Sequence, residues 1–129
     1  MTDNNSASAP NTDSAPAPRQ PPMVGPVPTI GRIVHYRLTK DQADATNKRR
    51  ADSRRNLTMH RKHSTGVQIH WGNDVAEGDV FPMMIVRVWG DTPGAAVNGQ
   101  VALDGNDVLW VTSVSVGDRP GSWAWPPRA

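Results

Sequence analysis

A cluster of basic residues between positions 48 and 62 is the feature of this sequence with the clearest capacity for chemistry. The segment carries seven Lys or Arg residues and a single acidic one, Asp52. On a helix most of these cations share one side, and such a strip binds nucleic-acid backbones because each phosphate contact releases counterions. The same strip is also typical of a solvated helix face. The candidate phosphate-binding or acid-binding residues are Lys48, Arg49, Arg50, Arg54, Arg55, Arg61 and Lys62.

Outside this basic segment, the C-terminal part of the chain has an excess of acidic residues. Residues 64–129 carry three basic and seven acidic residues, and residues 1–47 balance to zero, so the formal net charge is only +2. This split predicts either contact with an acidic partner or attraction between the basic segment and the acidic part of the same chain.

Tryptophan is the second candidate for ligand contact, because five Trp residues accompany one Phe and one Tyr. Trp rings stack on bases and nucleotides, although packing in a core is the commoner role of the residue. We expect Trp89 and Trp110 to pack inside the protein. The predicted aromatic platform comprises Trp71, Trp123 and Trp125.

Metal binding and catalysis are disfavoured. His60, His63 and His70 lie in or beside the basic segment, where positive charge repels a cation, and they lack zinc-site spacing. The chain has no cysteine, which excludes thiolate ligands and disulfides. The sequence therefore predicts no metal and no cofactor.

Two carboxylates, Asp104 and Asp107, face each other across a predicted turn, where Asx-type hydrogen bonding explains them better than catalysis does. The sequence shows no nucleophile–base arrangement, phosphate-cradling loop or GxSxG motif. We predict that the protein is not an enzyme. A small hydrolase that uses the Asp-rich loops is the least favoured alternative.

Two regions must position these residues. Residues 1–28 hold seven of the twelve prolines, mixed with Ala and Ser, which predicts a disordered tail with polyproline character. The functional alternative for this tail is a docking motif for a proline-binding partner. Residues 29–129 are expected to form one compact β-rich domain with a basic helical or loop insertion at about 40–65.

The domain begins with a β-prone run from Ile33 to Thr39. Thr39 and Gln42 are spaced as a capping box, which predicts a helix from Lys40 to about Leu57. This helix lacks an apolar stripe and is expected to lie on the surface or to fray into a loop.

Several strands follow. Residues 67–71 alternate as a half-buried strand, and residues 80–89 are apolar enough for a central strand covered on both faces. Pro82 must then occupy a bulge or an unpaired position. A two-residue turn at Gly105-Asn106 pairs Val101 with Trp110 and Val97 with Val114, which places Trp110 on the core face.

These elements indicate a mainly β protein: a small barrel or roll of five to six short antiparallel strands with one peripheral basic helix. A last short run, Ser122 to Trp125, completes the strands before Pro126 and Pro127 end it.

A longer stretch supports a family resemblance. The string GDVFPMMIVRVWGDTPGAAVNGQVALDGNDVLWVTSVSVGDRPGSWAWP at 78–126 resembles small uncharacterised proteins encoded by tailed bacteriophages and prophages of actinobacteria. The run GRIVHYRL at 31–38 and the Asn47–Arg50 stretch are similar to the same family. The resemblance implies a viral origin and action in the host cell or a place in the particle, and it assigns no catalytic residue.

Together these observations predict a phage accessory protein that acts as a non-enzymatic binding module in the host cytoplasm. The partner would be a host protein, a nucleic acid or a nucleotide-like ligand. A minor virion component is the alternative. The sequence shows no signal peptide and no apolar run long enough to span a bilayer, so no membrane contact is expected.

Overall fold

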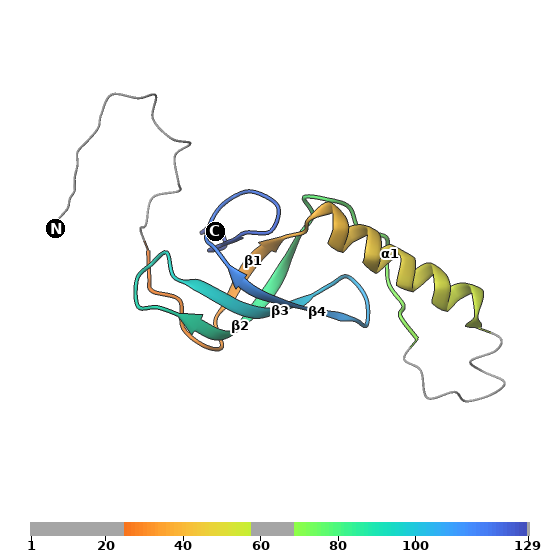
Figure 1. The fold of residues 1–129 in the computed structure, drawn as a ribbon, viewed down its shortest axis with the longest axis horizontal. Coiled ribbons are helices and arrows are strands. Elements are labelled where there is room, and N and C mark those ends of the chain that lie inside the picture. The colour runs from red at the N-terminus through yellow and green to blue at the C-terminus, as the bar shows by residue number, and fades with distance from the viewer. Residues whose placement is uncertain (1–24, 58–68, 129) are drawn as a thin grey trace, which may run out of the picture.

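The domain is a five-stranded antiparallel sheet with one helix at its side (Figure 1). A computed structural model describes residues 25–57 and 69–128. The strand order is β4-β3-β2-β1-β5. The elements are β1 (Ile33–Arg37), α1 (Lys40–Arg55), β2 (Val80–Trp89), β3 (Ala96–Ala102), β4 (Val108–Val114) and β5 (Trp123–Ala124).

The predicted mainly β class with one peripheral helix is confirmed, whereas a closed barrel is not formed. The edge strands β4 and β5 do not pair along their length. The chain after β4 instead reaches β5 through an isolated parallel bridge between Val116 and Trp123. Trp123 N donates to Ser115 O at 3.0 Å, and Gly117 N donates to Trp123 O at 2.9 Å. The sheet is therefore an open roll whose edges meet at one point.

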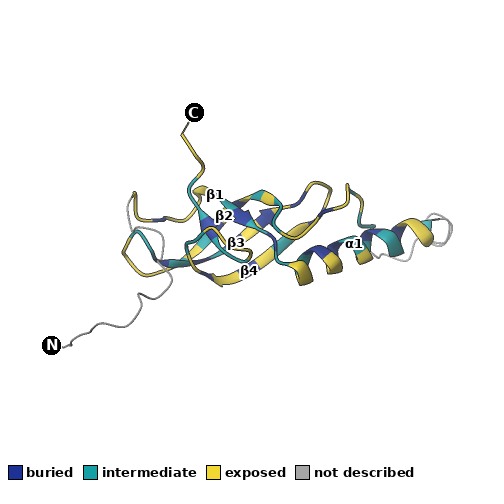
Figure 2. Cartoon of the chain, turned by 90° about the horizontal axis from the view of Figure 1, so that it is seen from above, coloured by how far each residue is buried: buried dark blue, intermediate teal, exposed yellow. Residues whose placement is uncertain are grey.

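One face of the rolled sheet encloses the core (Figure 2). Alternate residues of each strand point inward because side chains alternate across a strand. Ala43 of α1 and Val75 of the following loop add to this cluster. The strand residues in the core are Val34, Tyr36, Met83, Ile85, Val97, Val101, Val111, Val114 and Trp123.

The central position of β2 is confirmed, but burial on both of its faces is not. Met84 on the outer face is 43% exposed, while Met83 and Ile85 are fully buried. The apolar run that suggested two-sided burial instead gives this sheet an apolar outer face.

Pro82 lies opposite His35 of β1, and its other side, toward β3, is unpaired, as predicted. Ile85 N donates to Arg32 O and Ile85 O accepts from Gly31 N, so the backbone groups of this residue face β1. By alternation the nitrogen of Pro82 faces β3. The β3 ladder begins only at the Met83–Val101 pair, so the missing N–H breaks no ladder bond.

β3 and β4 form the predicted hairpin with a register one residue away from the expected one. Val101 lies opposite Leu109, and Gln100 opposite Trp110. Trp110 therefore points outward and is 65% exposed, which corrects its placement in the core. The two-residue turn is replaced by a longer loop because Asp107 turns inward. A bulge in β4 then restores the predicted Val97–Val114 pair.

The segment before β2 also differs from expectation. Residues 67 and 68 lie outside the described residues, and residues 69–71 are not a strand. They pass beside the helix, where His70 N donates to Ser53 Oγ at 2.9 Å. Gly72 then forms an isolated bridge with Gly105.

The boundaries of tail and helix are close to those expected. Residues 1–24 lie outside the described residues, but Pro28 is fully buried, so the domain starts before residue 29. The capping box is confirmed: Gln42 N donates to Thr39 Oγ1 at 3.1 Å, and Thr39 N donates to Gln42 Oε1 at 3.0 Å.

Candidate functional site

Arg50, which the sequence placed on a phosphate-binding strip, is buried inside the protein. Its side chain is 0% exposed and binds Asp107 through two nitrogens, Nη2 to Oδ1 at 2.6 Å and Nε to Oδ2 at 3.2 Å. Its Nη1 donates to the carbonyl of Asn73. Arg50 is therefore a clamp between α1 and the β3–β4 loop, and it must be removed from the predicted binding surface.

Two glycines make room for this clamp. A Cβ at Gly72 would lie 2.6 Å from Cζ of Arg50, and one at Gly105 would lie 2.6 Å from its Nη2. The guanidinium thus occupies the space that side chains would fill where the two loops bridge. Burial acts to raise the pKa of the Asp107 carboxyl, but the hydrogen bonds and charge of Arg50 outweigh it and hold this pKa below its usual range.

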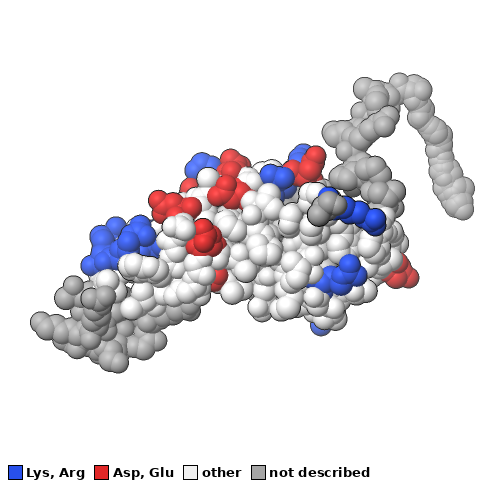
Figure 3. All heavy atoms as spheres, turned by 180° about the vertical axis from the view of Figure 1, so that it is seen from behind, with Lys and Arg blue, Asp and Glu red and all other residues white. Residues whose placement is uncertain are grey.

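Apart from Lys40 at its start, the other basic residues of α1 lie in its C-terminal half, where Lys and Arg gather on the surface (Figure 3). Asp52 bonds to both Lys48, at 2.9 Å, and Arg55. The hydrogen bond from Lys48 is the main cause that lowers the pKa of Asp52. Arg54 is exposed and Arg49 is half-buried. Arg61 and Lys62 lie outside the described residues.

Removing Asp52 tests how far it restrains this basic cluster. We expect Asp52→Ala to free Lys48 and Arg55 and to tighten the binding of a duplex oligonucleotide at low salt. The log–log slope of affinity against salt should steepen by up to about 1.8, two contacts at ~0.9 each. Fluorescence anisotropy at several salt concentrations measures it. Asp44→Ala is the matched control, because Asp44 pairs with Lys40 at the other end of the helix. Equal slopes in both variants would contradict the expectation.

The predicted aromatic platform is not assembled. Trp123 is 0% exposed and belongs to the core, because β5 turns it toward the inner face. Trp125 packs edge-on against it, with ring centroids 5.6 Å apart. Trp71 lies elsewhere, beside the β3–β4 loop, where its N donates to Asn106 Oδ1 at 2.9 Å. Trp123 is therefore withdrawn as a ligand contact.

Two other exposed tryptophans, Trp89 and Trp110, lie on the outer face of the sheet. The register places Ile33 opposite Met84, Met84 opposite Gln100, and Gln100 opposite Trp110, so one row crosses four strands. Beside this row, the same face carries Pro82 of β2 and the Ala102–Val108 pair. We call this surface the outer sheet face; its apolar members are Ile33, Val80, Pro82, Met84, Ala102, Val108 and Trp110.

A bulge extends the outer sheet face beyond these rows. The pairing of β2 shifts between Ile85 and Arg87, which turns both Arg87 and Trp89 outward. The Arg87 guanidinium lies 4.8 Å from the Trp89 ring centroid, and Trp89 Nε1 donates to Asn98 Oδ1 at 3.0 Å. Trp89, expected to pack inside, is thus an outer residue held in place by two contacts.

The charged residues of the sheet are all of one sign. None of the five strands contains Asp or Glu, and their formal charges are those of Arg37 and Arg87. The outer face of a one-side-buried antiparallel sheet is ordinarily polar. An apolar, acid-free outer face with two exposed Trp residues is therefore a departure that calls for a function.

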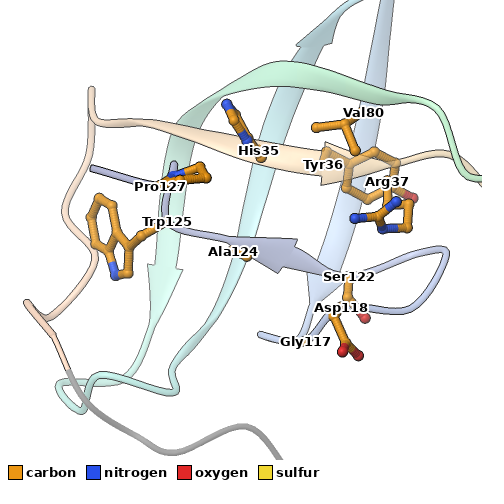
Figure 4. Close-up of a pocket in the computed structure, with 10 residues that line it drawn as sticks. All are labelled: His35, Tyr36, Arg37, Val80, Gly117, Asp118, Ser122, Ala124, Trp125 and Pro127. Atoms are coloured by element: carbon orange, nitrogen blue, oxygen red, sulfur yellow. The ribbon is translucent and has the colours of Figure 1, made fainter. Parts of the chain in front are cut away.

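A pocket of about 150 Å³ adjoins this face between β1 and the C-terminal segment (Figure 4). His35 and Val80 line it from the sheet, and Asp118, Ser122 and Trp125 line it from the other side. Arg37 also lines it while donating from Nη1 to Gly78 O at 3.0 Å. Its small volume suits a side chain better than a nucleotide.

Sequence reasoning missed the outer sheet face because a strand with apolar residues at every position is typical of two-sided burial. The mixed polarity of the opposing hairpin faces was the available signal. It becomes informative only with the correct register, in which Trp110 joins Gln100 and Thr112 on the exposed side.

Comparison of the chain with protein-family models, curated proteins and solved structures finds no match. In the part of the chain that the structure describes, no helix has the length and apolarity needed to cross a membrane. No cluster of three or more His, Cys, Asp or Glu suited to a metal ion occurs among residues 25–57 and 69–128.

Proposed function

We propose that this chain is a non-enzymatic binding module that docks on a partner protein through its outer sheet face. The observation that carries the proposal is the exposure of Trp110, Met84 and Ile33 in one cross-strand row. Large apolar side chains grouped on an exposed face of a soluble protein, here with Gln100 between Met84 and Trp110, mark interaction sites.

The composition of the face favours a protein over a nucleic acid. Protein interfaces are enriched in aromatic residues, Met and Arg and depleted in Lys, Glu and Asp. The strands carry Trp89, Trp110, Met84 and Arg87 outward and contain no Lys, Glu or Asp. A surface for single-stranded nucleic acid needs a positive groove along its stacking residues, whereas the strands supply two cations to this face, Arg37 and Arg87, and Arg37 already donates to Gly78 O. The basic end of α1 is also weakened as a phosphate site by the loss of Arg50 and by Asp52.

The resemblance to actinobacterial phage proteins supports a viral accessory protein whose partner is a host protein in the host cytoplasm. Mass spectrometry of purified particles addresses the alternative of a virion component. Stoichiometric presence of the chain in particles would replace the host partner with a structural one.

A photo-crosslinker placed at Gln100, between Met84 and Trp110, tests the docking face. We expect a discrete heteromeric adduct in the producing cells that Trp110→Ser abolishes. Removing a central aromatic anchor typically weakens an interface by about 2 kcal/mol or more, roughly thirtyfold in Kd. Arg54→Ala is the matched control, since Arg54 is also exposed but lies on α1.

Three outcomes would count against this function. An adduct that Arg54→Ala removes and Trp110→Ser spares would transfer binding to the helix. An adduct that nuclease digests would identify nucleic acid as the partner. An adduct with the mass of two copies would make the face a self-association surface.

A further inference from the structure

The point where the described chain begins lies against a second hollow, on the Ile33 side of the outer sheet face. This hollow has a volume of about 300 Å³ and is lined by Pro26, Ile33, Trp125 and the 126–128 end. Gly25 lies directly beside the indole, since a Cβ on Gly25 would be 3.6 Å from Cδ1 and 3.8 Å from Nε1 of Trp125. The described chain therefore begins beside this hollow.

Trp125 presents an unused hydrogen-bond donor at the same place. Its Nε1 is buried and has no acceptor among the described residues. A buried N–H without an acceptor is unfavourable, and native proteins satisfy nearly all such groups. The Arg32 guanidinium lies 4.9 Å from the Trp125 ring centroid, so the indole is held in position while its N–H lacks a partner. Any hydrogen-bond acceptor, a backbone carbonyl oxygen included, would satisfy this donor.

The segment that precedes Gly25 has the chemistry to supply one. Residues 16–24 read PAPRQPPMV and contain a PxxP pattern from Pro18 to Pro21. Polyproline II helices make no internal hydrogen bonds, so their carbonyls are available, and PxxP segments dock in aromatic-lined grooves. The row that starts at Ile33 ends at the exposed ring of Trp110.

The length of segment 16–24 is also sufficient to span the row from Ile33 to Trp110. Ile33 and Trp110 are three strand spacings apart, about 14 Å at ~4.8 Å each. A polyproline II helix advances ~3.1 Å per residue, so about five residues cover this distance. Residues 16–24 exceed it from a starting point beside Trp125.

We propose that the proline-rich segment 16–24 docks on its own domain, with a backbone carbonyl accepting from Trp125 Nε1 and its prolines packed from Ile33 toward Trp110. The segment then occupies part of the outer sheet face, the surface assigned above to a partner protein. In that respect this second proposal rests on the proposed function. The docking itself requires no partner, so the two proposals stand or fall in separate experiments.

Paramagnetic relaxation in the full chain tests the docking. The natural sequence has no cysteine, so Ala17→Cys creates a unique position for a nitroxide label. The five indole N–H signals of the ¹⁵N-labelled chain are the readout. We expect the Trp125 and Trp110 signals to lose most of their intensity relative to the reduced label, while the Trp71 signal, beside the β3–β4 loop, keeps its intensity. A label at Ala7→Cys, further along the chain, is the control and should have a smaller effect.

Replacing Pro18, Pro21 and Pro22 by alanine in the labelled chain should restore both signals, with the remaining spectrum reporting an unchanged fold. Intensity losses that are absent, or equal at all five indoles, would overturn the proposal. So would losses that survive the proline substitutions. Losses of the same size after mixing labelled ¹⁴N chain with unlabelled ¹⁵N chain would show docking between copies and would overturn docking in the same chain.

Discussion

Replacing Arg50 with alanine is expected to lower the free energy of unfolding by about 3–5 kcal/mol, because removing one partner of a buried pair leaves the other charge unpaired. Asp107, which is 5% exposed in the natural chain, would lose both guanidinium bonds. The carbonyl of Asn73 would lose its donor as well. Urea denaturation followed by circular dichroism measures the change.

Two companion variants make this result specific. Arg54→Ala, four residues further along the same helix, should change stability by no more than about 0.5 kcal/mol, as for most surface substitutions. Arg50→Met combined with Asp107→Leu should recover most of the loss, since an apolar pair of similar size often replaces a buried ion pair without penalty. Comparable, small losses in Arg50→Ala and Arg54→Ala would show that the pair is not buried.

The same pair predicts how stability depends on pH. Because the pKa of Asp107 lies below its usual value in the folded protein, its contribution is present above the unfolded pKa of about 3.9. That contribution is lost as the pH falls through the lower folded pKa. The stability difference between the natural chain and the Arg50→Met, Asp107→Leu variant should therefore shift toward the variant below about pH 4. A difference that stays constant with pH would contradict the ion pair.

Replacing Trp123 with alanine is expected to cost about 3–5 kcal/mol, the range for a large buried aromatic. Trp123 is fully buried, packs against Trp125 and forms the bridge between the two edges of the roll. Trp110→Ala should change stability by about 0.5 kcal/mol or less, because this side chain is mostly in solvent.

Chemical denaturation of both variants under the same conditions gives the comparison. The ordering is the sensitive test, since the register expected from the sequence alone predicts a large effect at Trp110. A greater loss for Trp110→Ala than for Trp123→Ala would restore that register and remove the outer sheet face.

Local signals in the sequence predicted most of the elements. Contacts between residues far apart in the sequence could not be predicted from those signals. The capping box at Thr39 and Gln42 fixed the start of α1, because its hydrogen bonds form within three residues. The hairpin register depended on Asp107, whose partner lies 57 positions away in sequence. An acidic residue beside a Gly-Asn pair is typical of a turn, so nothing local indicated that it was buried.

The prediction of the site residues was wrong in part for the same reason. A helical strip of cations gives no sign of which member turns inward, and Arg50 was identified only by the carboxylate and the two glycines around it. The acid-free strands were readable in the sequence. Their meaning as a docking face required knowing which side of the sheet remained open.

The polar attachment of α1 has a consequence for partial unfolding. Of the four buried residues of the helix, Ala43 is the only apolar one; Thr46, Arg50 and Ser53 are polar. When the helix detaches, these groups regain water and little apolar surface is uncovered. The partly unfolded state should therefore resist aggregation, because the apolar core stays buried inside the rolled sheet when the helix detaches.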